Sequence, residues 1–165
     1  MNTIKTALIT GASQGFGLAL AQALAEKGWQ IIINGRNAER LLTAQKQLAK
    51  TTDVAAISGD VRDEIHLLQL RDVLISHKWK LDLIVNNASA LGTSPLSHLL
   101  DHPVDNLHEL YHTNIIAPIS LLQKVKDYLQ PGIQIINLSS DAAVEAYAGW
   151  GAYSSSKAAL DHLSA

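Results

Sequence analysis

The feature that most constrains the fold is a regular alternation of short, β-branched apolar runs with longer stretches of helical periodicity. The apolar runs predict strands at Thr6–Thr10, Gln30–Asn34, Val54–Ser58, Asp82–Asn86 and Ile133–Leu138. The stretches between them predict helices at about 15–27, 38–50, 63–77, 104–129 and from 152 onward. Strands that alternate with helices in this way form a parallel sheet with right-handed crossovers and with helices on both faces.

Three of the predicted strands are apolar at nearly every position, over residues 31–33, 83–85 and 133–136. Central strands that are buried on both faces have this composition, so we expect all three to be buried. The first two helical stretches each carry an apolar face of the kind that packs on a sheet, formed by Leu18, Ala21 and Ala25 and by Leu41, Ala44 and Leu48. No internal repeat, low-complexity tract or linker interrupts the 165 residues, which predicts one domain.

The composition excludes several classes of function. Hydrophobic residues make up 47% of the chain and charged residues 17%, as in an ordinary globular domain. The formal net charge of −2 provides no basic surface for nucleic acid and no polybasic segment for lipid. The absence of cysteine excludes disulfides and thiolate metal sites. Because we find no signal peptide and no run of the ~18 apolar residues that a membrane span needs, we expect a cytoplasmic protein.

A glycine-rich turn, Thr-Gly-Ala-Ser-Gln-Gly-Phe-Gly over residues 10–17, follows the first predicted strand. Its glycines would let the backbone approach a pyrophosphate, and the helix that begins within it would offer free N–H groups and the positive end of the helix dipole. A turn that only packs a strand against a helix also favours glycine. The position directly after the first strand of a strand–helix–strand unit favours dinucleotide binding.

Tyr153 and Lys157, in the run Tyr-Ser-Ser-Ser-Lys, form a second motif. Residues four apart on a helix share a face. A tyrosine hydroxyl titrates near ~10 in water and is a poor base at neutral pH, but a nearby ammonium stabilises the phenolate. Such a pair can exchange a proton with an alcohol or carbonyl oxygen. Taken alone the pair also arises by chance.

Ser139 and Ser140 come at the C-terminal end of the fifth predicted strand. In open α/β sheets this end of the strands is where ligands bind. A serine hydroxyl at this place can donate a hydrogen bond to a substrate oxygen. The alternative is a loop serine that caps the next segment of the chain.

Five motifs occur in a fixed order: Thr10–Gly17, Asn86-Asn87-Ala88, Asn114, Ser140, and the pair Tyr153 and Lys157, with Ser140 thirteen residues before the tyrosine. In this order and spacing the whole chain resembles the short-chain dehydrogenase/reductase family. The resemblance implies an α/β fold, in which residues 1–165 form a single NAD(P)-binding domain. Its expected core is a Rossmann-type, doubly wound parallel sheet with strand order 3-2-1-4-5.

The resemblance implies four catalytic residues. Tyr153 would be the acid/base that protonates the substrate carbonyl oxygen, and Lys157 would stabilise its phenolate and hold the nicotinamide ribose. Ser140, in preference to Ser139, would donate a hydrogen bond to the same oxygen, and Asn114 would anchor a water that relays protons to Lys157. The residue chemistry agrees, because fixed donors stabilise the oxyanion that hydride transfer creates, while the cofactor carries the hydride.

The resemblance also implies a cofactor site at the ends of the first four strands. Asn87 and Ala88 would run under the adenosine ribose, next to Ser89, where the family usually has glycine. Asp60 would face the adenine amino group together with Val61, or would cap the helix that starts near Arg62, or both. In addition to Tyr153 and Lys157, the predicted cofactor-binding residues are Gly11, Ser13, Gln14, Gly15, Phe16, Gly17, Arg36, Asp60, Val61, Asn87 and Ala88.

The end of the second strand predicts which cofactor binds. NAD-selective relatives place an acidic residue there to accept the ribose hydroxyls, whereas this chain has Gly35 followed by Arg36. The planar guanidinium of an arginine suits a 2′-phosphate. We therefore expect NADP (NADPH), with NAD less favoured. A solvated surface arginine is the alternative, and Gln14 stands where many NADP-dependent relatives carry a second basic residue.

We expect no metal site, and we interpret all seven histidines as surface or loop residues: His66, His77, His98, His102, His108, His112 and His162. Tyr147 and Trp150 lie between Ser140 and Tyr153 in the sequence, so we expect them to wall the substrate site. Packing in the core is the alternative for both aromatic residues.

The chain ends at Ala165, eight residues after Lys157 and within a predicted helix. Family members usually continue with another strand, a substrate-covering loop and helix, and a last strand, so we expect this sequence to be part of a longer protein. Without those elements we expect the fifth strand to be left as an open edge of the sheet. We expect an NADP-dependent oxidoreductase that acts on a small-molecule carbonyl or alcohol and is a homo-oligomer in its full-length form, with no nucleic-acid or membrane partner. The alternative is a truncated, non-catalytic NADP-binding module.

Overall fold

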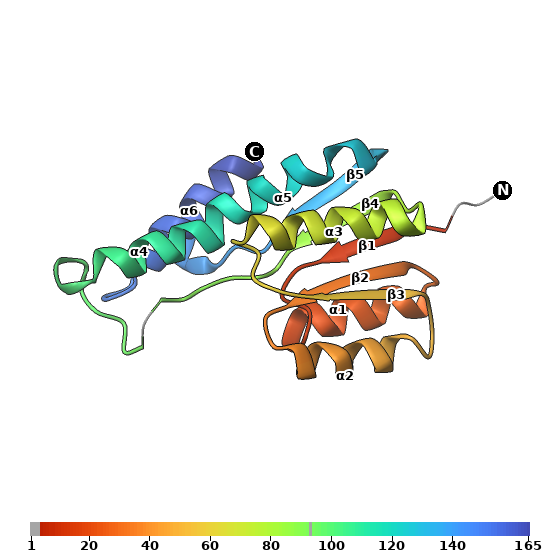
Figure 1. Ribbon diagram of the computed structural model, residues 1–165. Helices are drawn as coiled ribbons and strands as arrows, with labels where there is room; N and C mark the ends of the chain where they lie inside the picture. The colour runs from red at the N-terminus through yellow and green to blue at the C-terminus, as the bar shows by residue number, and fades with distance from the viewer. Residues whose placement is uncertain (1–3, 93) are drawn as a thin grey trace.

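A five-stranded parallel sheet in the order β3-β2-β1-β4-β5 forms the centre of the computed structural model, which describes residues 4–92 and 94–165 (Figure 1). The strands are β1 (Thr6–Ile9), β2 (Gln30–Gly35), β3 (Val54–Ser58), β4 (Leu81–Asn86) and β5 (Leu129–Asn137). In the register of the central pairs, Ala7 lies opposite both Ile31 and Leu83. The α/β class and the strand order predicted from the sequence are confirmed.

Both faces of the central strands are buried, and alternate side chains enter different layers. Ile9 and Ile33 belong to the core beneath helices α1 (Gly15–Glu26) and α2 (Ala38–Leu48), whereas Leu8, Ile32 and Ile84 belong to the core beneath α3 (Glu64–His77) and α5 (Ala117–Val125). Each of these side chains is fully buried, and burial of such a side chain contributes about 1.5–3 kcal/mol to the free energy of unfolding. Figure 1 shows α1 and α2 together on one side of the sheet and α3 and α5 on the other.

The helix predicted over 104–129 is interrupted. It consists of α4 (Val104–Tyr111), a π turn η2 (His112–Ile116), α5 and a short 3₁₀ turn η3 (Lys126–Tyr128). Pro118 has no N–H, so the carbonyl of Asn114 lacks the donor that an α-helix supplies four residues later. The helical hydrogen bonds at this place span five residues and not four, and Ala117 N–H donates to the carbonyl of His112. The backbone is helical throughout residues 104–128, so the predicted helix is present, and the π turn is a local departure within it that periodicity did not predict.

The remaining elements are the 3₁₀ turns η1 (Leu99–Asp101) and η4 (Asp141–Ala143) and the helix α6 (Gly151–Ser164), which packs against η4, η2 and α4. Within the described part of the chain, no helix is long and apolar enough to span a membrane.

Strand β5 is not the buried strand that its apolar sequence predicts. It begins at Leu129, four residues earlier than expected, and within the described ranges it pairs with β4 alone. Ile135 is 42% exposed and Ile136 is 44% exposed. The composition of a doubly buried strand is present, but in this structure the strand lies at an edge of the sheet.

The interpretation of all seven histidines as surface or loop residues is wrong for His66, which lies on α3 and is 2% exposed. His102 is 7% exposed, but it lies in the loop that follows η1, as predicted. A histidine at a single position carries no sequence signal of its depth, because burial depends on which neighbouring loop covers the ring.

We expect a protein that consists of Met1–Ala165 alone to self-associate and to have little or no turnover. The free side of β5 presents unpaired backbone groups beside exposed isoleucines, and such an edge is a template for pairing with another chain. Light scattering over a concentration series tests this expectation. A species that stays monomeric at high concentration and has normal reductase activity would contradict it.

Candidate active site

A cleft of about 380 Å³ lies at the carboxyl ends of β1, β2, β3 and β4. Eight of the predicted cofactor-binding residues line it: Gly11, Ser13, Gln14, Arg36, Asp60, Val61, Asn87 and Ala88. Eight residues that were not predicted to bind the cofactor line it as well: Asn34, Gly35, Asn37, Arg40, Gly59, Ser89, Ala90 and Thr113. Gly15, Phe16 and Gly17 are not among the lining residues, and they form the N-terminal turn of α1 beside the cleft.

Close packing explains the glycines of the turn after β1. Gly11 has φ 65°, and a Cβ added there would lie 2.9 Å from the Cα of Ala88. A Cβ added at Gly17 would lie 2.6 Å from Nδ2 of Asn87. That amide nitrogen donates to the carbonyls of Thr10, at 2.9 Å, and of Gly11, at 3.1 Å. Asn87 therefore holds the end of β4 against the glycine-rich turn, and only glycine fits between them.

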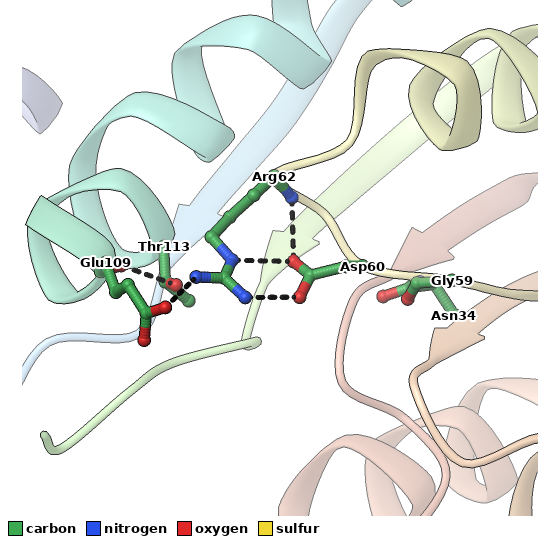
Figure 2. Close-up of polar contacts among 6 residues, drawn as sticks. All are labelled: Asn34, Gly59, Asp60, Arg62, Glu109 and Thr113. Atoms are coloured by element: carbon green, nitrogen blue, oxygen red, sulfur yellow. Dashed lines mark hydrogen bonds and ion pairs between the residues drawn. The ribbon is translucent and has the colours of Figure 1, made fainter. Parts of the chain in front are cut away.

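Asp60 is held by Arg62 where the cleft meets the end of β3, as Figure 2 shows. Arg62 donates through Nε at 3.1 Å and through Nη2 at 2.8 Å, and its backbone N–H donates to the same carboxylate at 2.9 Å. The side-chain hydrogen bond from Arg62 lowers the pKa of Asp60, so the group stays ionised although burial opposes this. The helix-capping alternative for Asp60 is wrong, because Asp63 caps α3 by accepting from Ile65 N–H.

Arg36 lines the cleft and is joined there by a second arginine that the sequence analysis missed. Asn37 accepts from the N–H of Arg40 at 2.9 Å and so starts α2, and Nη1 of Arg40 donates to Oε1 of Gln14 at 2.9 Å. Thus the second basic group near Gln14 comes from α2 and not from the glycine-rich turn. The spacing of four between Arg36 and Arg40 at a helix start was the available signal.

Asn114 sits in the π turn, 1% exposed, with its side-chain hydrogen-bonding capacity fully used. Oδ1 accepts from Ala90 N–H at 2.8 Å and from the Ser89 hydroxyl at 3.1 Å. Nδ2 donates to the carbonyl of Ala90 and to Oγ of Ser156, each at 2.9 Å. The predicted water therefore has no place on this amide, and the backbone carbonyl of Asn114, for which Pro118 provides no donor, is the group that could hold it.

Lys157 and Tyr153 lie on α6, and the lysine points toward the end of β5. Lys157 is 3% exposed, and its ammonium donates to the carbonyl of Leu138 at 2.5 Å. Burial lowers the pKa of Lys157. Its nitrogen lies 5.7 Å from the centre of the Tyr153 ring, so the expected ammonium–phenol pair is brought together.

Ser140 follows β5 and caps η4. Its Oγ accepts from Ala142 N–H at 3.2 Å and donates to Oδ1 of Asp141 at 2.9 Å. The capping alternative thus holds for Ser140, and donation to a substrate oxygen requires release of the aspartate. Ser139, the competing residue, is exposed.

Three aromatic rings form a row beside this end of the sheet. Trp150 lies edge-on to both Tyr147 and Tyr153, with ring centroids 5.8 Å apart in each pair. Tyr147 is 40% exposed, which removes core packing as its explanation. Its hydroxyl donates to Glu145, and this hydrogen bond raises the pKa of Tyr147 to about 12. In the part of the chain that the structure describes, no group of three or more potential metal ligands occurs.

A parallel sheet in this order, with a glycine-rich turn and a helix N-terminus at the end of β1, defines a dinucleotide-binding α/β fold. The sequence profile described as short chain dehydrogenase matches residues 5–165. The chain belongs to the short-chain dehydrogenase family.

Individual relatives agree with this assignment. A probable NADP-dependent dehydrogenase of Haemophilus influenzae is 36% identical over 162 residues, which are 96% of this chain and 62% of that protein. An NAD⁺-bound xylitol dehydrogenase is 28% identical, with a TM-score of 0.88 over 96% of this chain and 62% of that chain. An alcohol dehydrogenase from the archaeon Thermococcus sibiricus, complexed with 5-hydroxy-NADP, is 26% identical, with a TM-score of 0.88 over 98% and 68% of the two chains. The chain thus spans about 62% of the length of the first of these relatives.

We expect Asn114→Ala to lower the free energy of unfolding by about 2–4 kcal/mol, because it removes four hydrogen bonds that join the loop after β4 to the buried Ser156 of α6. Asn106→Ala, at a half-buried position of α4, is the matched control and should cost less than about 0.5 kcal/mol. Urea denaturation measures both variants. Equal destabilisation by the two would contradict the assignment of a structural role to the Asn114 amide.

Proposed function

We propose that this protein is an NADP-dependent oxidoreductase that transfers a hydride between nicotinamide and a carbonyl/alcohol pair. The observation that carries the proposal is the meeting of two features at the carboxyl edge of one sheet. One is a glycine-walled cleft with two arginines, and the other is the buried Lys157 beside Tyr153. Dehydrogenases and oxidoreductases among the relatives support the reaction class.

The residues present fit a dinucleotide. A Cβ added at Gly15 would meet nothing within 4 Å, so the backbone of the glycine-rich turn is open there to the close approach of a pyrophosphate. The N-terminus of α1 has no side-chain cap, so its first N–H groups are available to an anion. Arg36 and Arg40 lie where β2 ends, and Asp60 remains an acceptor beside them, after the neighbouring strand β3. When bound, the nicotinamide supplies the hydride.

The residues around Tyr153 perform the proton chemistry. The Tyr153 hydroxyl would give its proton to the carbonyl oxygen as negative charge develops there, and would take one from an alcohol in the reverse direction. Lys157, held by the carbonyl of Leu138, keeps a positive charge close to that phenol. Ser140 would donate a second hydrogen bond to the same oxygen after leaving Asp141.

The cofactor choice rests on the end of β2. Since the xylitol dehydrogenase structure holds NAD⁺, the fold alone does not select NADP. The related Haemophilus influenzae protein is described as NADP-dependent, and the Thermococcus sibiricus structure holds an NADP derivative. Gly35 offers no carboxylate to the ribose hydroxyls, while Arg36 and Arg40 offer two guanidinium groups to a phosphate.

We expect Tyr153→Phe to reduce kcat by roughly 10²–10⁴-fold and to leave NADPH binding within about twofold, because only the acid is removed. Tyr128→Phe, in η3 and packed against the core beneath α3 and α5, is a control and should keep the parent rate. Stopped-flow oxidation of NADPH with a panel of aldehydes and ketones provides the measurement. A Tyr153→Phe enzyme with more than half the parent rate would rule out the role, and binding without any turnover in the parent would favour the non-catalytic alternative.

We expect NADPH to bind more tightly than NADH by tens-fold, and Arg36→Ala to remove most of this preference without changing NADH binding. Each charge-assisted bond to the 2′-phosphate contributes about 1.5–3 kcal/mol. Arg40→Ala should weaken NADPH less, because Arg40 also holds Gln14, and the double variant should bind both cofactors equally. Dissociation constants from fluorescence titration test this, with Arg71→Ala on α3 as the control.

Replacement of Gly35 by aspartate is a poor test of the predicted preference for NADPH over NADH. A Cβ at Gly35 would lie 2.9 Å from Cβ of Ser13 and 3.0 Å from its Oγ, so the new side chain would displace the glycine-rich turn. Removal of the arginines leaves that turn untouched. If the ratio of the NADPH and NADH constants does not change in either arginine variant, the NADP assignment loses its main support.

A further inference from the structure

A buried histidine lies directly under the floor of the cleft. His66 occupies the first turn of α3, and a Cβ added at Gly59 would lie 2.2 Å from its Nδ1 and 2.5 Å from its Cγ. Gly59 itself lines the cleft. The ring therefore packs against the backbone that forms the wall of the site, and no step of the proton chemistry uses it.

The ring contacts Asn34, whose side-chain amide joins the ends of three strands. Oδ1 of Asn34 accepts from Gly11 N–H at 3.3 Å, in the glycine-rich turn after β1. Nδ2 donates to the carbonyl of Gly59 after β3, at 3.0 Å, and lies 2.6 Å from Nε2 of His66. Asn34 ends β2 and is buried, and Figure 2 shows it beside Gly59 at the edge of the site.

The two backbone partners determine which way this amide points. Gly59 offers only a carbonyl acceptor and Gly11 only an N–H donor, so a flipped amide would place oxygen against oxygen and nitrogen against nitrogen. With the observed orientation, Nδ2 presents its second hydrogen to His66. Nε2 of His66 must then be an acceptor, which requires a neutral ring that carries its proton on Nδ1.

We propose that His66 is a positioning residue of the dinucleotide cleft: its neutral ring fixes the Asn34 amide between the three loops, and protonation of the ring releases this amide and weakens cofactor binding. The inference rests on the proposal that the cleft binds a dinucleotide. A proton on Nε2 would face the amide hydrogens of Asn34. The amide could relieve this contact only by turning, which would oppose it to Gly11 N–H and to the carbonyl of Gly59.

The surroundings of the ring agree with a neutral resting state. Burial lowers the pKa of His66, while Gln69, Asp63 and Asp60 act in the opposite direction. Among the described residues, Nδ1 has no hydrogen-bond partner, so no acceptor stabilises a proton there and the contact of Nε2 with Asn34 alone determines this tautomer. The other charges nearby are compensated: Arg62 is paired with Asp60, and Glu64 with Lys124 of α5. Because the pKa lies below its usual value near 6.5, the ring is neutral at pH 7 and takes up a proton only in acid.

The direct test is a histidine ¹⁵N NMR titration of the whole protein with and without saturating NADPH. We expect the Nδ1–H tautomer of His66 at pH 7.5, and we expect the cofactor to lower the pKa of this ring. This follows from linkage, because a proton that weakens cofactor binding must itself bind less tightly in the complex. An Nε2–H tautomer, or the same pKa in both states, would overturn the proposal.

Binding measurements provide the second test, between pH 5.0 and 8.0, where circular dichroism confirms that the protein is folded. In the parent, NADPH and NADH should both bind about threefold or more weakly at the acid limit than at pH 7.5. NADH is included because the 2′-phosphate of NADPH titrates in the same range, whereas the effect of His66 must appear with both cofactors. Tight binding at pH 7.5 without this pH dependence would defeat the inference and leave the proposed function intact.

Variants at position 66 distinguish a role of His66 in positioning the Asn34 amide from a role in packing the core. His66→Gln keeps an acceptor for Asn34 and should bind NADH nearly as tightly as the parent, with no remaining dependence on pH. His66→Leu keeps the volume but not the acceptor and should bind several-fold more weakly at every pH. His77→Gln, at the exposed end of the same helix, is the control and should retain the parent profile. A parent-like pH profile in His66→Gln would assign the titration to another group.

Discussion

The burial of both faces of β1, β2 and β4 is the constraint on which the rest of the structure depends. With Leu8, Ile32 and Ile84 on one side and Ile9 and Ile33 on the other, these strands can exchange backbone hydrogen bonds only within the sheet. The helices are then confined to the two faces, and every strand enters the sheet in the same direction. Consequently all functional loops leave from one edge, where side chains from distant parts of the sequence meet.

Three asparagines hold this edge together. Asn34 joins the ends of β1, β2 and β3, Asn87 joins β4 to the glycine-rich turn, and Asn114 joins the loop after β4 to α6. An amide can donate and accept at once, so one buried side chain satisfies backbone groups of both kinds from different loops. The site is therefore ordered by fixed polar contacts, while the apolar layers below supply most of the free energy of folding.

The sequence predicted what depends on periodicity, and missed what depends on contacts between distant residues. The strands follow from apolar runs such as those at Ile31 and Leu83, and the parallel sheet from their alternation with helices, whereas the order of the strands came from the resemblance to the family. The π turn depends on Pro118 together with the tertiary bonds of Asn114, and helical periodicity carries neither signal. The open edge at β5 was predicted, but the burial expected there from composition was wrong, because an edge strand can have the composition of a central one.

In the candidate site, too, features set by local sequence motifs were predicted and features set by contacts between distant residues were missed. The glycines, Arg36 and the pair Tyr153 and Lys157 were predicted from motifs, and the structure brings the members of each group together. Arg40 was missed because its contact with Gln14 joins α2 to the glycine-rich turn. His66 was missed because its burial arises where α3 passes under Gly59, and a lone histidine in a helical stretch gives no sign of this.

The electrostatics at the ends of β2 and β3 bear on the proposed cofactor preference. Asp60 is the only carboxylate that lines the described cleft, and it would oppose a phosphate if its charge were free. Arg62 neutralises it through two side-chain hydrogen bonds, and Glu109, 3.7 Å from Arg62, is exposed to screening by solvent. Less negative charge is thus left to oppose a phosphate beside Arg36 and Arg40. Under the proposed function, Arg62 would favour a phosphorylated ribose through the charge that it neutralises at the end of the neighbouring strand.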